Sequence, residues 1–187
     1  PHKYFDKSTL PIIPFLKSYI ALKYNFKAFQ FRFSKNKRTD FDKYENALYE
    51  IFKRDFILNK PTFMGKPVDI IHQAFYNNKE RSFWHIVTSG GEDLSRSFDE
   101  DRCGSMPWAK ALIEDRTSCT EYKIWSKWHD QTNRNRYYIW CSKVNYMVVL
   151  EDRTNFFKLI TAFNVHPYKV KSYQKDYESY IKTKTPT

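Results

Sequence analysis

Glycine and cysteine are both scarce in this chain of 187 residues, which holds four glycines and three cysteines. The cysteines (Cys103, Cys119 and Cys141) lie far apart and form no CxxC pair, which argues against a zinc site and against a disulfide framework. We therefore expect reduced thiols, as in a cytoplasmic protein. No apolar run approaches the roughly 18 residues that a membrane-spanning helix needs, so we expect no membrane partner.

The first residues, Pro1-His2-Lys3-Tyr4, do not form a signal peptide, and they lack an initial methionine. We interpret the chain as a processed protein or as a fragment of a longer one, such as an effector domain cut from a larger polypeptide.

Positive charge and aromatic side chains are abundant. Hydrophobic residues make up 41% of the chain and aromatic residues 19%, which is enough for a packed core. The 32 Lys and Arg outnumber the 21 Asp and Glu, giving a net charge of +11. A domain this basic favours a polyanionic partner such as nucleic acid, because Lys and Arg that meet phosphates release condensed counterions.

Hydrophobic periodicity and turn residues predict an α+β protein with two parts. An N-terminal helical extension is expected over residues 1–62, with helices at 10–29 and 41–57. A core is expected over residues 66–187, in which helices follow the first strand and an antiparallel sheet ends in a three-stranded meander. The predicted elements of the core are a strand at 82–88, helices at 93–104 and 107–116, meander strands at 136–142, 146–151 and 156–163, and a short helix at 172–181.

The run from Phe83 to Gly91 carries one histidine, His85, in an apolar segment that ends at two glycines. Downstream, Arg96, Asp99 and Arg102 recur at a spacing of three, which would place them on one face of the predicted helix. A lone histidine on a strand is most often a core residue with satisfied nitrogens, and the charged trio could be a solvated face with an internal ion pair.

Metal-independent RNA cleavage needs these side-chain types. The 2′-hydroxyl attacks the neighbouring phosphate, so the protein supplies a base, an acid for the leaving 5′-oxygen, and donors that stabilise the crowded phosphorane. Histidine suits either proton-transfer role because its ordinary pKa is about 6.5. Arginine suits the third role because it stays charged and presents several donors.

Residues 66–170 resemble phage- and toxin-associated nuclease domains of the barnase/EndoU/colicin/RelE-like superfamily. The resemblance lies in Phe83-Trp84-His85-Ile86-Val87-Thr88, in Arg96-Ser97-Phe98-Asp99 with Arg102, in Pro107-Trp108, and in the three meander segments. It implies a compact α+β fold that cleaves RNA without metal or cofactor and leaves a 2′,3′-cyclic phosphate. The substrate is then RNA, with tRNA, mRNA on the ribosome and free RNA all open. A toxic nuclease must be restrained in its producing cell, so an antitoxin or immunity protein is a candidate partner.

Residue by residue, the resemblance assigns the catalytic positions to His85, Arg96, Arg102 and Thr161. Thr161 would hydrogen-bond a phosphate oxygen, and otherwise it is an ordinary strand residue. His166, five residues further on, is the nearest candidate for a second proton carrier, and Arg136 is a further phosphate-binding candidate. We interpret Arg134 and Lys158 as exposed charges.

Three alternatives remain open from the sequence. Asp115 with Glu121 and Lys123 could form a metal-dependent nuclease site, although the surrounding segment looks like helix or loop and such triplets are common by chance. A non-catalytic nucleic-acid-binding module could use the alternating phenylalanines of residues 26–33 with Lys35, Lys37 and Arg38. The arm 1–62 could instead dock a protein inhibitor or the parent polypeptide.

Overall fold

The computed structural model describes residues 37–90, 95–115 and 119–184, and the chain falls into two compact units, Pro1–Glu45 and Asn46–Thr187. Helix α2 (Lys37–Phe52) begins in the first unit and continues into a π-helical turn, η2 (Lys53–Leu58), which confirms the helix predicted at 41–57. The helix predicted at 10–29 and the phenylalanine-rich segment 26–33 lie outside the described residues.

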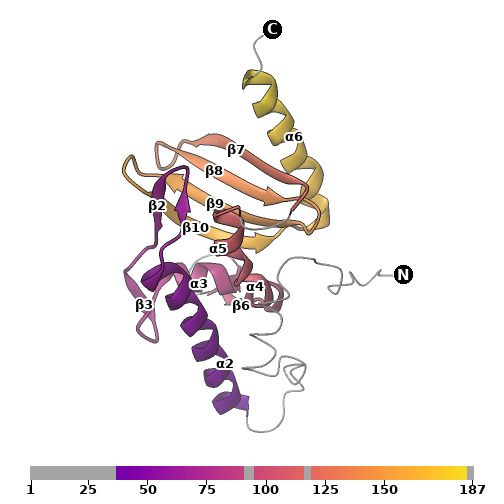
Figure 1. Cartoon of the computed structure of the whole chain (residues 1–187). Coiled ribbons are helices and arrows are strands. Elements are labelled where there is room, and N and C mark those ends of the chain that lie inside the picture. Colours follow the sequence, from indigo (N-terminus) through magenta and orange to yellow (C-terminus); the bar gives the residue numbers. More distant parts are fainter. Residues whose placement is uncertain (1–36, 91–94, 116–118, 185–187) are drawn as a thin grey trace, which may run out of the picture. The chain divides into compact units, whose positions relative to one another are not determined.

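A six-stranded sheet organises the second unit (Figure 1). Its order is β1 (Thr62–Phe63), β2 (Lys66–Asp69), β10 (Phe157–Asn164), β9 (Tyr146–Asp152), β8 (Arg134–Cys141) and β7 (Tyr122–His129). Strands β7 to β10 form an antiparallel meander, which confirms the three predicted strands and adds β7 before them. Only β2 and β10 pair in parallel within this sheet. The fold is of the α+β class, as predicted.

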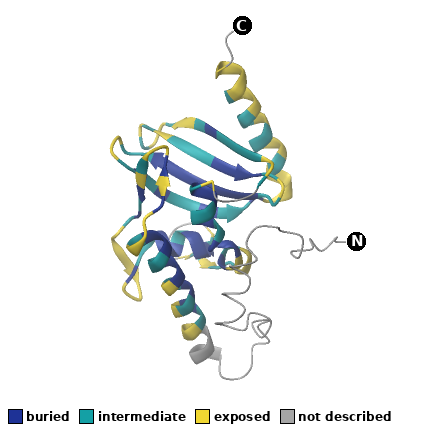
Figure 2. Cartoon of the chain, in the orientation of Figure 1, coloured by how far each residue is buried: buried dark blue, intermediate teal, exposed yellow. Residues whose placement is uncertain are grey.

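Helices cover this sheet on both of its faces. Helix α5 (Trp108–Ile113), predicted at 107–116, packs on β8 and β9, and α3 and α4 lie along β10. The C-terminal helix α6 (Pro167–Lys184) packs on β7, where its tyrosines surround Trp125. It confirms and extends the helix predicted at 172–181. The residues buried between these layers run along the central strands (Figure 2).

The strand predicted at 82–88 is wrong, because these residues form helix α3 (Arg81–Val87). A strand with one buried face would alternate, but Phe83, Trp84, Ile86 and Val87 are all buried. A short apolar run does not distinguish a strand from a buried helix, and here the helix buries every side chain except Arg81 and His85. The chain becomes extended only afterwards, in the two-residue ribbon β5 (Thr88–Ser89) and β6 (Ser97–Phe98).

The helix predicted at 93–104 is also wrong in its first half. Among the residues that are described there, Ser97 and Phe98 form β6, and helix α4 is only Glu100–Ser105. Asp99 is the N-cap of α4, and its carboxylate accepts a hydrogen bond from the backbone N–H of Arg102 at 3.0 Å. An aspartate in this role ends the extended segment and starts the helix. Arg96, Asp99 and Arg102 therefore do not share one helix.

Two of the three thiols are not reduced, contrary to the prediction. Cys119 and Cys141 form a disulfide, with their Cα atoms 6.1 Å apart, and Cys103 is free and buried. The antiparallel register explains the pairing, because it places Tyr122 opposite Cys141 and so brings the residues before β7 to the end of β8. Within the described ranges, none of the helices has the length and apolar character needed to cross a membrane.

A small hairpin completes the unit. Strands β3 (Ala74–Tyr76) and β4 (Lys79–Glu80) are joined by Asn77 and Asn78, which both have positive φ. Two successive residues of this kind make the tight turn that hairpins favour, and asparagine tolerates it well. The hairpin leads directly into α3.

Candidate functional site

Helix α3 carries His85 and Arg81 on the one side of the helix that is not fully buried. The two residues are four positions apart, so they are neighbours on the helix surface, and every other residue of α3 is buried. His85 itself is half-buried. Because this segment is a helix and not the predicted strand, Arg81 lies one turn away from His85. On a strand the two residues would lie much farther apart.

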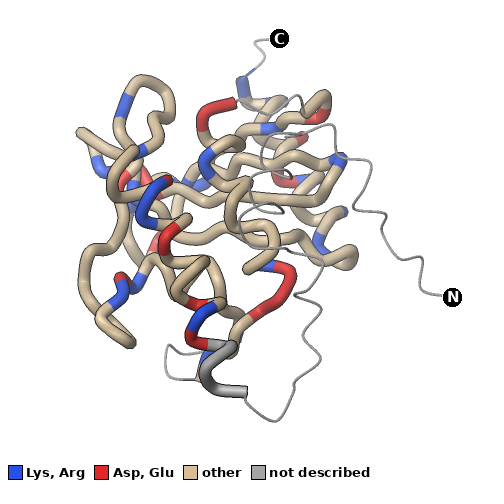
Figure 3. Tube along the Cα trace, turned by 60° about the horizontal axis from the view of Figure 1, so that its bottom comes forward, with Lys and Arg blue, Asp and Glu red and all other residues tan. Residues whose placement is uncertain are grey.

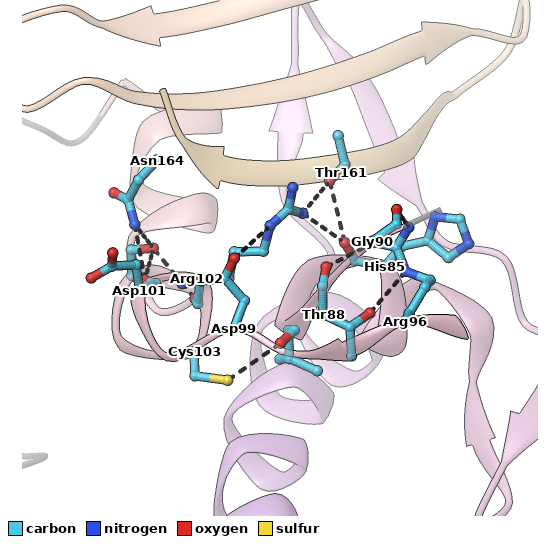
Figure 4. Close-up of polar contacts among 12 residues, drawn as sticks. His85, Thr88, Gly90, Arg96, Asp99, Asp101, Arg102, Cys103, Thr161 and Asn164 are labelled. Carbon is cyan, nitrogen blue, oxygen red and sulfur yellow. Dashed lines mark hydrogen bonds and ion pairs between the residues drawn. The ribbon is translucent and has the colours of Figure 1, made fainter. Parts of the chain in front are cut away.

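Three segments meet at the backbone of His85 (Figure 4). The Arg102 side chain reaches from α4, and its Nη1 donates to the His85 carbonyl and to Thr161 Oγ1, both at 3.2 Å. The Thr161 hydroxyl in turn donates to the same carbonyl at 3.3 Å. These contacts end on the main chain of His85, and they fix α3 against β10.

An irregularity in β10 positions the Thr161 hydroxyl. The pairing with β9 shifts between Leu159 and Thr161, and the buried positions change from Phe157 and Leu159 to Ala162. Such a bulge re-aims the side chains that follow it. Without the shift, Thr161 would continue the buried series of Phe157 and Leu159, and its hydroxyl would point into the core.

Arg96 lies beside His85 and is held by neutral oxygens (Figure 4). Its Nε donates to Thr88 Oγ1 at 2.9 Å and its Nη2 to the Thr88 carbonyl at 2.7 Å, with a longer contact from Nη1 to the Gly90 carbonyl. Hydrogen bonds to neutral acceptors orient a guanidinium without cancelling its charge. Arg96 thus keeps a fixed positive charge at the start of the β5–β6 ribbon.

The imidazole of His85 is surrounded by cations. Burial, followed by the charges of Arg96, Arg81, Arg102 and Lys158, lowers its pKa from the ordinary 6.5 to about 4. The ring is therefore neutral at physiological pH and able to accept a proton. A concentration of positive charge around a neutral histidine is an arrangement suited to an anionic ligand.

Lys158 is half-buried on β10, contrary to its interpretation as an exposed charge. Burial, and then the charge of Arg153, lowers the pKa of its ammonium group. Among the described residues, no carboxylate lies within ion-pair distance of Lys158 Nζ. Glu151, its partner across the β9–β10 register, is instead engaged by two arginines.

Those two arginines are Arg136 and Arg153, and they occupy a buried carboxylate. Glu151 is 1% exposed, and it lies 3.3 Å from Arg136 Nε and 2.6 Å from Arg153 Nη2. Hydrogen bonds and these two charges lower its pKa although burial alone would raise it. Arg136, which was predicted to contact phosphate, therefore forms an ion pair with Glu151 in the sheet. It is one of many basic residues, which lie on helices and strands alike (Figure 3).

His166 is not part of the cluster that the structure brings together. It is exposed, precedes α6, and stacks on Tyr168 with 5.4 Å between ring centroids. Among the described residues, the contacts of His166 are with Tyr168 and Lys169 on α6, and its charge is not among those that act on the His85 ring. Of the predicted basic loop, Lys37 and Arg38 belong to α2, and Lys35 lies outside the described residues.

The residues of the metal-dependent alternative are occupied differently. Lys123 lies on strand β7, not on a helix or loop, and its Nζ donates to Ser142 and Gln174 at 3.0 and 2.9 Å. Glu121 accepts a hydrogen bond from Ser142 at 2.6 Å, and Asp115 lies beyond the end of α5. Across the described ranges, no three His, Cys, Asp or Glu side chains are grouped to hold a metal ion.

Sequence reasoning missed Arg81 and Lys158. The spacing of four between Arg81 and His85 would have marked one helical face, but only if the run had been assigned to a helix. Lys158 stands between the apolar residues Phe157 and Leu159, as a solvent-exposed strand residue also would. Only its position opposite Glu151 marks it, and that position is known only from the β9–β10 register.

Comparisons with known proteins give no relative for this fold and site: no family model, no curated protein and no solved structure matches the chain.

Proposed function

We propose that this protein is a metal-independent endoribonuclease that cleaves RNA through attack of the 2′-hydroxyl on the adjacent phosphate, leaving a 2′,3′-cyclic phosphate. The observation that carries the proposal is the neutral, half-buried His85 among four cations contributed by α3, α4, the β5–β6 ribbon and β10. The phosphate backbone supplies the negative charge that such a cluster lacks.

His85 is the proposed base. With a pKa of about 4, its imidazole is unprotonated at neutral pH, and it can take the proton of the 2′-hydroxyl. A bound phosphate would offset the surrounding positive charge and raise this pKa, which strengthens the base once the substrate is in place.

Arg102 and Arg96 are proposed to stabilise the charge of the phosphorane. Arg102 is oriented by Thr161, by the His85 carbonyl and, at 3.7 Å from Nε, by Asp99. A guanidinium that is already in position loses little freedom when it binds a phosphate oxygen. Thr161 serves mainly to position Arg102, and its hydroxyl can turn to a phosphate oxygen when the substrate displaces the internal hydrogen bond.

Lys158 is the proposed proton donor to the leaving 5′-oxygen, the role that sequence analysis gave to His166. The charge of Lys158 contributes to the low pKa of His85. The charge of Arg81 lowers the pKa of both His85 and Lys158, so the three side chains belong to one cluster. The lowered pKa of the Lys158 ammonium group makes it a better acid than an ordinary lysine.

Incubation of the purified protein with total RNA in EDTA tests the function. We expect the wild type to cut RNA and to leave 2′,3′-cyclic phosphate ends, and His85→Ala to lose cleavage while still binding RNA. His166→Ala is the matched control, since it removes an exposed histidine outside the cluster, and it should keep wild-type activity. Failure of the wild type to cut RNA, with or without added metal, contradicts the proposal.

The role of Lys158 has a separate test. Lys158→Arg keeps the positive charge but does not release a proton near neutral pH, whereas Lys158→Gln removes both. If Lys158 is the acid, both variants lose activity on an ordinary RNA and recover it on a substrate with a good leaving group, such as a p-nitrophenyl ester. Full activity of Lys158→Arg on ordinary RNA would assign only a charge role to Lys158.

A further inference from the structure

The β3–β4 hairpin holds an aromatic side chain outside the core. Ala74 pairs with Glu80 and Tyr76 with Lys79, so Phe75 is an extra residue without a partner on the opposite strand. A bulge of this kind turns the side chain of the extra residue out of the regular alternation. Phe75 remains 37% exposed, although an aromatic ring of its size is ordinarily buried.

The hairpin is fixed to the first turn of α3. The backbone N–H of Arg81 donates to the Gln73 carbonyl at 2.9 Å, and Trp84 Nε1 donates to the Tyr76 carbonyl at 3.1 Å. The Tyr76 and Trp84 rings meet edge to face, with centroids 5.2 Å apart. Phe75 therefore has a defined position relative to the helix that carries His85.

Arg81 connects Phe75 to the proposed catalytic centre. Its guanidinium carbon lies 5.8 Å from the centroid of the Phe75 ring, within the range of a cation–π contact. On the helix, Arg81 and His85 are one turn apart, a rise of about 6 Å, and they share the half-buried side of α3. The chain thus offers, in order, an exposed ring, a guanidinium and the imidazole.

We propose that Phe75, supported by Arg81, is a stacking subsite for the base of a nucleotide that flanks the scissile phosphate. Since a base within a duplex already stacks on its neighbours, the subsite selects unpaired RNA, and because every base has a π-face it does so with little sequence preference. This inference rests on the proposed ribonuclease function and adds the class of substrate.

Binding can be measured without cleavage. A short single-stranded 2′-O-methyl oligoribonucleotide lacks the attacking hydroxyl, so its affinity reports recognition alone. Loss of one base–aromatic stack is expected to weaken binding by about 5- to 100-fold in Phe75→Ala and Phe75→Leu, whereas Phe75→Tyr keeps the ring and should bind as the wild type does. Leucine preserves an apolar side chain, so it separates stacking from apolar contact.

Tyr168→Ala is the matched control. Tyr168 is 75% exposed and has a cation, Lys169 Nζ, at 5.8 Å from its ring centroid, but it lies on α6. Its removal should leave the affinity within twofold. Equal losses in the two alanine variants would indicate general aromatic attraction, and unchanged affinity in Phe75→Ala would indicate that Phe75 serves another partner. Either result overturns the subsite.

A scan of single abasic positions along the same oligonucleotide locates the base. At one position the abasic change should weaken wild-type binding and add nothing to Phe75→Ala, because both remove the same stack. Additive losses at every position contradict the inference. The two proposals fail separately. A wild type that binds RNA through Phe75 but does not cut it removes the catalytic function, and a Phe75→Ala variant that binds and cuts RNA as well as the wild type removes the subsite.

Discussion

The pKa of His85 is the quantity on which the proposed chemistry depends most directly. It is expected near 4 in the free protein, compared with an ordinary 6.5, and burial is the largest cause, followed by the charge of Arg96. A single charge a few ångströms away is worth about 1 kcal/mol in a solvent-exposed setting and more where water is excluded. Arg96→Gln should therefore raise the pKa of His85 by about one unit, and not restore it to 6.5.

Two comparison variants isolate the charge. Arg96→Lys keeps the positive charge but changes the hydrogen bonds to Thr88 and Gly90, so the pKa of His85 should remain low. Lys158→Gln removes the weakest of the four cationic influences, and it should raise the pKa by less than Arg96→Gln does. The pKa of His85 should therefore rise more in Arg96→Gln than in Lys158→Gln.

NMR titration of the His85 ring protons, assigned by comparison with His85→Gln, measures these values. A wild-type pKa near 6.5 would refute the reasoning, and so would an unchanged pKa in Arg96→Gln. Phosphate, in contrast, should raise the pKa, because it offsets the charges that lower it.

The same group makes stability depend on pH. As the pH falls below 6.5 the unfolded chain takes up a proton at His85, whereas the folded chain does so only near pH 4. The unfolded state thus binds more protons in this window, and the free energy of unfolding falls as the pH falls from about 6.5 to 4. A pKa that differs this much between the two states corresponds to about 3 kcal/mol in the free energy of unfolding, and solvent screening of a half-buried ring reduces this contribution. Urea unfolding of wild type and His85→Gln should show this contribution only in the wild type.

Three further changes test the frame around the site. Thr161→Val removes the hydroxyl that joins Arg102 to the His85 carbonyl, and it should destabilise the fold by about 1 kcal/mol in urea unfolding and lower kcat more than it raises KM; a wild-type kcat would exclude a positioning role. Asp99→Ala removes the N-cap of α4 and should cost about 1 kcal/mol, while Asp99→Asn should recover most of it. Cys119→Ser opens a loop closed across a separation of 22 residues and should cost about 3 kcal/mol, a loss that dithiothreitol reproduces in the wild type and does not increase in the variant.

The sheet could be predicted from the sequence, and the local structure around His85 could not. The strands β8 to β10 are rich in Val, Ile, Tyr and Phe and are joined by short polar turns, so the meander follows from local signals. The apolar run around His85 carries no period that separates helix from strand, because both of its sides are buried. Its helical state depends on packing against β10, which is distant in sequence.

The same reason explains which site residues were found. His85, Arg96 and Arg102 stand out as chemically capable side chains, and the structure does bring them together. Lys158 and Arg81 become recognisable only through the register of β10 and the turn of α3. The disulfide escaped prediction for a related cause, since Cys119 and Cys141 are brought together by the pairing of β7 and β8 and by no local motif.

The contact between Arg102 and Thr161 spans 59 positions of the chain, and that between His85 and Thr161 spans 76. Strand β10 is the last strand of the sheet to be synthesised. A growing chain that already contains His85, Arg96 and Arg102 therefore still lacks Lys158 and Thr161. Contacts between such distant residues form late, after the intervening strands have paired. The proposed ribonuclease would therefore acquire its complete site only after its final strand has been added.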